Sequence, residues 1–335
     1  MLEAERVFVP GYFPPASGLC CPDAFIYQHV MEGVQTILLP DRNIVSRMAQ
    51  IAAGQPMGPM LRKVAGIKAF CHFLDIQIEP SIAFHELAHN QGNAAANAEL
   101  ARFREADNAN PYQWLDLVFG DRDALDAVEL SSSPSSHDLA FPLRRWRRNY
   151  IAALKIAELE LSDASNLERM RALLTWMRDD FMIAGPAALL ASIYFAPRSP
   201  PRKGLFKQLH SPNRDKAIDG VRNAAWDLTH LSDMVQRVNG AGDAPDRLLF
   251  ASFDERLRIL VRLLFSVSSR GDPERELRAA LVGWWGASKA KDIAALLIEL
   301  LEEAGEESRR VRQAGSPLSI DELIELGEQR IRSLV

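Results

Sequence analysis

Two short apolar runs that favour strands are the feature that most constrains the fold. The run 34–39 (Val-Gln-Thr-Ile-Leu-Leu) stops at Pro40-Asp41, and the run 247–252 (Arg-Leu-Leu-Phe-Ala-Ser) is closely followed by Asp254. Their length and composition predict buried strands, each with a carboxylate at its C-terminal end. Because long helical patterns separate them, we expect an α/β fold with a parallel sheet and a large helical insertion.

The remaining pattern is mostly helical and sets the expected domain organisation. Apolar spacing predicts helices over 43–53, 60–75 and about 213–238, one that begins near Ser81 and contains Glu86, and a capping box at Ser319 and Glu322 that opens a C-terminal helix. We expect an N-terminal arm (1–33), a core in two parts (34–96 and 213–264), a helical insertion (97–212) and a helical C-terminal region (265–335).

Composition and charge narrow the class of protein. A chain of 335 residues is long enough for one large domain or two ordinary ones. An apolar share of 47% and a charged share of 25% are typical of soluble globular proteins. The net charge of −5 argues against broad, non-specific coating of nucleic acid, although it leaves room for a local basic channel.

Cysteine usage and the absence of targeting signals predict a cytoplasmic protein. The three cysteines form neither a disulfide framework nor a four-ligand zinc site, since two of them are adjacent: Cys20, Cys21 and Cys71. The acidic N-terminus lacks the basic start of a secretory signal. The longest apolar stretch, 181–196, is interrupted by Gly185-Pro186 and predicts a buried helix, so we expect no membrane partner.

The segment Phe84-His85-Glu86-Leu87-Ala88-His89 contains the His-Glu-x-x-His pattern of zinc peptidases. On a helix, His85 and His89 share one face and both could bind Zn²⁺, with Glu86 as general base. The segment resembles the metzincin helix as far as Gly92, but Ala95 stands where that pattern needs a third histidine. A zinc metallopeptidase is therefore one candidate, and two partly exposed histidines on an ordinary helix are the alternative.

Four carboxylates far apart in the sequence support a different chemistry. Leu38-Leu39-Pro40-Asp41-Arg42-Asn43 resembles the first strand of PIN-domain nucleases, and the segments around Asp227 and Asp254 resemble their later acidic helix and strand. Glu86 falls where that family places its glutamate. The resemblance covers 34–90 and 213–262, and the sequence departs from it at Pro40 and Arg42.

The PIN-like resemblance implies a metal-dependent nuclease that hydrolyses RNA by a two-metal mechanism. Asp41, Glu86, Asp227 and Asp254 would be catalytic ligands of Mg²⁺ or Mn²⁺, which prefer oxygen ligands. Asn43 would orient Asp41, while His85 and His89 would lie behind the ligands or face the substrate. In a parallel sheet such acids meet beyond the C-terminal strand ends.

Each acid also has a structural interpretation. Asp41 and Asp254 both stand where a helix begins, so each could be an N-cap. Asp227 lies among apolar neighbours and would need a partner if it is buried. Arg42 replaces a small hydroxyl residue and leaves open a non-catalytic, PIN-like binding scaffold.

A basic stretch between 197 and 216 is the candidate substrate-binding segment. Its positive residues would guide a phosphate backbone towards the metals: Arg202, Lys203, Lys207 and Arg214 are the candidates. A solvated loop with incidental charge is the alternative. RNA is therefore the expected partner, and the sequence leaves room for a regulatory protein and for a homo-oligomer.

Overall fold

The computed structural model describes residues 2–12, 18–128, 130, 136–199, 204–241, 246–266, 272–303 and 318–334. The chain forms two compact units, each built from two stretches of sequence. The first unit comprises 1–141 and 233–258, and the second comprises 142–232 and 259–335. Each unit is described by itself.

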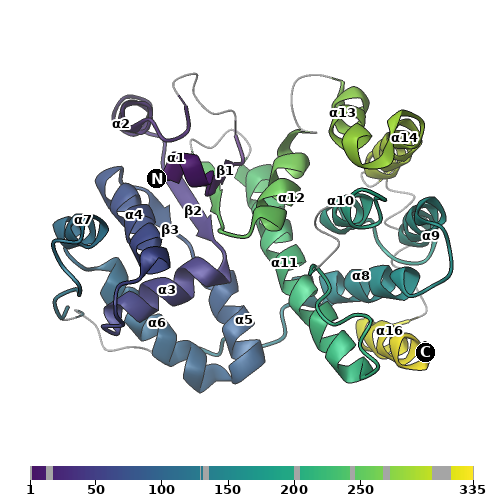
Figure 1. Ribbon diagram of the computed structural model, residues 1–335, viewed down its shortest axis with the longest axis horizontal. Coiled ribbons are helices and arrows are strands. Elements are labelled where there is room, and N and C mark those ends of the chain that lie inside the picture. Colours follow the sequence, from purple (N-terminus) through teal and green to yellow (C-terminus); the bar gives the residue numbers. More distant parts are fainter. Residues whose placement is uncertain are drawn as a thin grey trace. The chain divides into compact units, whose positions relative to one another are not determined.

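A small mixed sheet lies at the centre of the first unit (Figure 1). Its order is β1 (Phe8–Pro10), β4 (Arg247–Ala251), β2 (Thr36–Pro40) and β3 (Gln77–Ile78). Strands β4, β2 and β3 run parallel, whereas β1 is antiparallel to β4. The two predicted strands are therefore neighbours, and the mixed α/β class is confirmed.

Helices of the first unit cover the sheet and build its core. They are α1 (Leu2–Glu5), α2 (Pro22–Glu32), α3 (Arg42–Ala52), α4 (Pro59–Phe73), α5 (Ser81–Gln91), α6 (Asn93–Asp107) and α7 (Pro111–Phe119). Phe8 of β1 stacks on Phe70 of α4 with ring centroids 5.3 Å apart, and Phe25 of α2 meets the same ring edge-on. Leu38 of β2 and Trp114 of α7 are fully buried in this cluster. Burial of these side chains supplies the main stabilisation of the unit.

The structure corrects two of the expected boundaries. The segment 1–33 is more than an arm, because β1 adds a strand to the sheet and Phe25 of α2 enters the core. The helical insertion begins near 142 rather than at 97, since Phe103 of α6 and Trp114 of α7 pack into the first core. Helices α3, α4 and α5 begin within a residue of the predicted positions.

The second unit consists of helices and their connections, without a strand among its described residues. It contains α8 (Arg144–Glu160), α9 (Asn166–Asp179), α10 (Gly185–Tyr194), α13 (Pro273–Trp285), α14 (Ala287–Glu303) and α16 (Ile320–Ser333). It also holds 214–232 of α11 (Arg214–Ala241) and 259–266 of α12 (Glu255–Ser266). Residues 187–196 are buried, and Trp285 Nε1 donates to the Ser192 carbonyl at 2.6 Å, so the predicted buried helix is confirmed.

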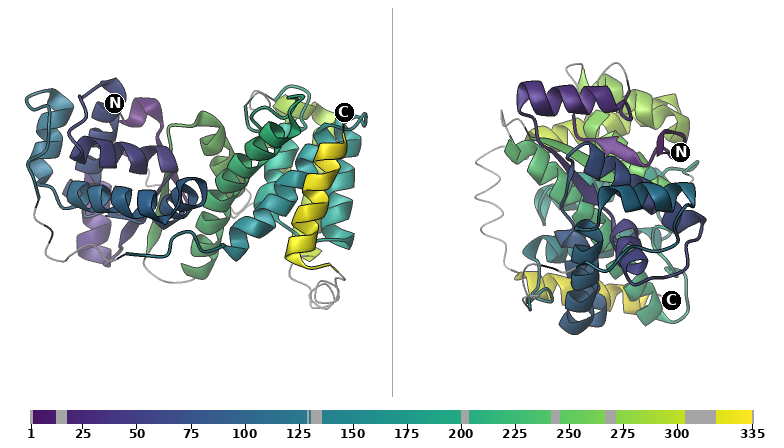
Figure 2. Two further views of the ribbon diagram at one scale, coloured as in Figure 1. Left: turned by 90° about the horizontal axis from the view of Figure 1, so that it is seen from below. Right: turned by 90° about the vertical axis from the view of Figure 1, so that its left-hand side faces the viewer.

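Helices α8, α11 and α16 pack together in the second unit, with α16 in yellow beside α8 in Figures 1 and 2. Trp146 of α8 stacks on Tyr150 at 5.0 Å between ring centroids, and Trp226 of α11 lies 5.5 Å from Trp146. The buried amide of Asn149 donates to Thr229 Oγ1 and Ser232 Oγ of α11. Trp146 therefore has a packing role in the core of the second unit.

No helix in the described parts of the chain is long and apolar enough to cross a membrane.

A half-buried histidine beside a buried lysine makes the stability of the first unit depend on pH. Lys68 of α4 is buried and contacts Asp107 Oδ1 at 2.5 Å. Burial, reinforced by the positive charge of Lys68, lowers the pKa of the neighbouring His72 to about 4. The unfolded chain takes up this proton near pH 6.5, so the free energy of unfolding falls as the pH drops from about 6.5 to about 4.

We expect His72→Gln to remove this part of the pH dependence. Since the His72 side chain is only half-buried, solvent limits the effect to roughly 1 kcal/mol. Urea unfolding between pH 4 and pH 7 measures it. His210→Gln, which alters an exposed imidazole of the second unit, controls for the loss of a histidine. An unchanged acid slope in His72→Gln would contradict the assignment.

Candidate functional site

Asp41 lies at the C-terminal edge of the sheet, where β2 passes into α3. Its amide continues the ladder by donating to the Ala251 carbonyl at 2.9 Å. The carboxylate is buried, and Oδ1 accepts a 3.0 Å hydrogen bond from the Ile44 amide. Asp41 is therefore the N-cap of α3, which confirms the structural interpretation of this residue.

Ser252 joins the two strand-end acids. Its fully buried hydroxyl donates a short hydrogen bond to Asp41 Oδ2 and accepts one from the Asp254 amide at 2.9 Å. Asp254 is exposed, and its Oδ1 accepts from the Arg256 amide at 2.8 Å, so it caps α12. The predicted proximity of Asp41 and Asp254 at one sheet edge arises from the pairing of β2 with β4.

Arg42 is held away from Asp41 by a bidentate ion pair with Glu99 of α6. The two N–O distances are 2.6 and 2.8 Å, and both side chains are about four-fifths shielded. Asn43 is exposed on the first turn of α3, and its carbonyl accepts from Arg47. The residue that departs from the PIN pattern thus fastens α3 to α6.

A second acidic group at the same edge was missed in the sequence. Glu79 directly follows β3, and its Oε1 accepts from the Ser81 amide at 3.1 Å. Arg237 of α11 lies 3.8 Å from Glu79 and donates to the buried Asp233 at 2.7 Å. Glu79 follows strand β3 in the sequence as Asp41 follows strand β2, which is the pattern that could have identified it. Strand β3 has only two residues, so the sequence predicts this strand weakly.

The His-Glu-x-x-His helix is α5, which begins after β3. Glu86 is half-buried, and His89 is exposed. His85 Nδ1 lies 2.8 Å from the Leu139 carbonyl, so it donates there, and the ring meets Phe141 edge-on. This bond ties residue 139 to α5 and leaves Nε2 of His85 as an acceptor.

Asp227 and the basic segment belong to the second unit. Asp227 is half-buried in α11, with Trp226 and Leu228 buried on either side. Arg202 and Lys203 lie outside the described residues, and Lys207 is exposed. Arg214 donates to three backbone carbonyls, those of Leu209, Ser211 and Leu334, which is a structural use of its guanidinium.

The described residues bring two carboxylates, Asp41 and Asp254, to the C-terminal edge of the sheet. Among the residues that the structure describes, no three His, Cys, Asp or Glu side chains form a group able to hold a metal ion. Zinc sites need at least three such protein ligands. Mg²⁺ commonly keeps several waters and uses only one or two carboxylates together with substrate phosphates. Asp41 and Asp254 supply oxygen atoms of that kind.

Comparison with protein-family models, with curated proteins and with solved structures gives no match to this chain.

Proposed function

We propose that this protein is a PIN-like phosphodiesterase that hydrolyses RNA with Mg²⁺ or Mn²⁺. One observation carries the proposal: Asp41 and Asp254 follow adjacent parallel strands, and Ser252 links them by hydrogen bonds. Ligands of α/β proteins bind beyond the C-terminal strand ends, which is where these acids stand. The order of acids in the sequence supports the same chemistry.

Asp41 is the central residue of the proposed site. Its burial makes the carboxylate depend on nearby positive charge or hydrogen-bond donors, and a divalent cation would supply such charge. Its Oδ1 accepts from the Ile44 amide and its Oδ2 from the Ser252 hydroxyl, so both oxygens are held in fixed positions. A cation held by this carboxylate would supply activation of a water and charge stabilisation of the leaving oxygen of the phosphodiester.

The other predicted residues of the first unit have supporting parts in the proposal. Asp254 and Glu86 bind the cation or its waters, and exposed Asn43 orients a metal-held water. His85 and His89 lie on the same helix as Glu86 and face the substrate or steady that carboxylate. Asp227, which the sequence also predicts as a ligand, belongs to the second unit and has no part in this proposed site. In this proposal Ser252 is a positioning residue, because it acts through Asp41.

Cleavage of single-stranded RNA in the presence of Mn²⁺ tests the function. We expect Asp41→Asn to reduce the cleavage rate by at least 10³-fold, because it removes charge that stabilises the transition state. Asparagine is as good an N-cap as aspartate, so α3 should stay intact. The initial rate is measured with a labelled oligonucleotide at saturating Mn²⁺ and compared with a reaction containing EDTA.

Asp272→Asn is the matched control. Asp272 caps α13 by accepting from the Arg275 amide at 3.2 Å, so the same chemical change is made at a cap in the second unit. Full activity in Asp272→Asn with loss in Asp41→Asn supports the site. Equal cleavage by the wild type and Asp41→Asn would refute it, and a folded protein without any cleavage would favour the non-catalytic scaffold.

A further inference from the structure

Helix α8 carries charges that oppose its own dipole. Its first turns contain four arginines and no acid: Arg144, Arg145, Arg147 and Arg148. Its last turn contains Glu158 and Glu160. The N-terminus of a helix favours negative charge and the C-terminus favours positive charge, so α8 is destabilised by its own pattern. Because much of α8 is buried, these charges need oppositely charged partners on neighbouring helices.

Helix α16 supplies the opposite pattern. Its first turn is acidic and its last turn basic. Asp321 pairs with Arg147 near the start of both helices, and Arg330 pairs with Glu158 near the end of both, so the two helices run in the same direction. The acidic N-terminal turn of α16 therefore lies against the basic N-terminal turns of α8.

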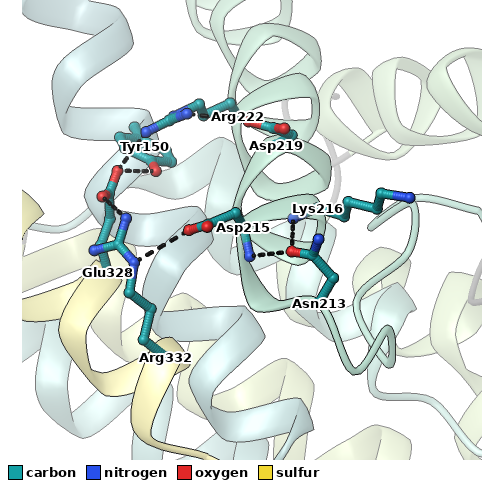
Figure 3. A network of polar contacts seen from close by, with 8 residues as sticks. All are labelled: Tyr150, Asn213, Asp215, Lys216, Asp219, Arg222, Glu328 and Arg332. Atoms are coloured by element: carbon teal, nitrogen blue, oxygen red, sulfur yellow. Dashed lines mark hydrogen bonds and ion pairs between the residues drawn. The ribbon is translucent and has the colours of Figure 1, made fainter.

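Glu328 is the centre of the contact (Figure 3). It accepts from the Tyr150 hydroxyl at 2.6 Å and from Arg222 of α11 at 2.9 Å, while Arg332 bridges Glu328 and Asp215. Burial acts to raise the pKa of Glu328, but the hydrogen bonds from Tyr150 and Arg222 outweigh it, and the pKa is lowered. Glu328 thus sits as an anion among donors suited to a carboxylate or a phosphate.

Helix α16 packs partly through apolar side chains, since Ile320, Leu323, Ile324 and Leu326 are half-buried. Ile331 is its only buried side chain within the described residues 320–333. Gly327 lies against Leu154 of α8, where an added Cβ would come within 3.0 Å of Leu154 Cδ1. Ion pairs add to these apolar contacts, and the pair of exposed Asp321 with Arg147 is the kind that is weak and sensitive to salt.

We propose that α16 is a reversible cover over an anion-binding surface formed by Arg147 of α8 and Arg222 of α11, and that the phosphate backbone of single-stranded RNA replaces the α16 carboxylates there. Asp321 and Glu328 stand seven residues apart, about 10 Å along the helix, a span that a few backbone phosphates also cover. Tyr150, which Glu328 contacts, adds an aromatic ring beside the arginines. Arginine with an aromatic ring favours RNA over an acidic protein segment.

Binding of a fluorescent single-stranded RNA by the full chain in EDTA tests this surface apart from cleavage, so its outcome is independent of the proposed function. Gly327→Leu should push α16 away from Leu154. We expect the dissociation constant of this variant for the RNA to be at least tenfold lower than that of the wild type. Two added phosphate contacts, at Arg147 and Arg222, should steepen the slope of log K against log salt by about 1.4, at about 0.7 per contact. Anisotropy titrations at several salt concentrations measure both quantities.

Three comparisons make the test decisive. Gly283→Leu makes the same change on α13, where nothing lies within 4 Å of an added Cβ, and should bind RNA as the wild type does. Arg222→Gln placed in the Gly327→Leu background should abolish the gain in affinity. A second opening variant, Asp321→Lys with Glu328→Lys, should match Gly327→Leu, and faster amide exchange in α16 reports its release.

The proposal fails if α16 exchanges faster in Gly327→Leu without a gain in RNA affinity over Gly283→Leu. It also fails if neither opening variant accelerates exchange in α16, because a helix that charge reversal cannot lift is no reversible cover. An equal gain in affinity for polyglutamate would overturn the RNA assignment in favour of an acidic protein partner.

Discussion

Gly220→Ala is expected to be the most destabilising of the glycine-to-alanine substitutions at the described glycines of the second unit. The added Cβ would lie 2.8 Å from the carbonyl carbon and 3.2 Å from the amide nitrogen of Lys207, and closer still to the carbonyl oxygen. These are backbone atoms, so no rotamer change relieves the overlap. Alanine favours a helix by about 1 kcal/mol over glycine, but we expect overpacking to outweigh this, with a net loss of about 3 to 5 kcal/mol.

Gly283→Ala is the matched control for Gly220→Ala. Both glycines lie within helices, yet nothing surrounds an added Cβ at Gly283, so this change should stabilise by about 0.5 to 1 kcal/mol. Tryptophan fluorescence in urea reports the second unit, because Trp114 is the only one of six tryptophans outside it. A Gly220→Ala midpoint equal to or above that of the wild type would contradict the close packing of residue 207 on α11.

Local patterns in the sequence predicted the elements whose signals are contained within a few residues. Strand β2 is apolar and contains β-branched Thr36 and Ile37, strand β4 is apolar, and both lie at the centre of the sheet. The capping box at Ser319 and Glu322 is present with both of its hydrogen bonds. Caps and buried strands are set by neighbouring residues, so periodicity is enough to find them.

Features that depend on distant partners could not be found in this way. Strand β1 has only three residues, in a segment rich in proline and glycine, and it is a strand because β4 pairs with it. Ser252 contacts Asp41 across 211 positions of sequence. The assignment of α6 to the first unit follows from its packing, which helical spacing alone does not specify.

At the candidate site, too, the sequence predicted the local features but not those that depend on distant partners. The sequence indicated both the metal-ligand and the N-cap interpretation of Asp41 and Asp254, and the structure confirms the caps. A metal role for these acids stays a prediction. The two roles are compatible, because an N-cap uses one lone pair of a carboxylate that has several.

Asp41→Ala separates the structural contribution of Asp41 from the charge required by the proposed chemistry. It removes the cap of α3, and it strands the hydroxyl of Ser252, which is fully buried. Loss of the cap costs about 1 kcal/mol and an unsatisfied buried hydroxyl about 1 to 3 kcal/mol, so we expect a total of about 2 to 4 kcal/mol. Asp41→Asn keeps an acceptor for the Ile44 amide but places an NH2 group where Oδ2 accepts from the Ser252 hydroxyl, so it should cost about 1 to 3 kcal/mol.

Asp272→Ala removes an exposed cap that has no buried hydroxyl behind it, and it should cost only about 1 kcal/mol. Amide hydrogen exchange resolves the two sites, since β2 and α3 report Asp41 while α13 reports Asp272. If Asp41→Ala opens α3 no more than Asp272→Ala opens α13, then the bond from Ser252 contributes nothing to the fold. In that case the hydroxyl serves only to hold the carboxylate in place for a ligand, and Ser252→Ala should reduce cleavage without affecting stability.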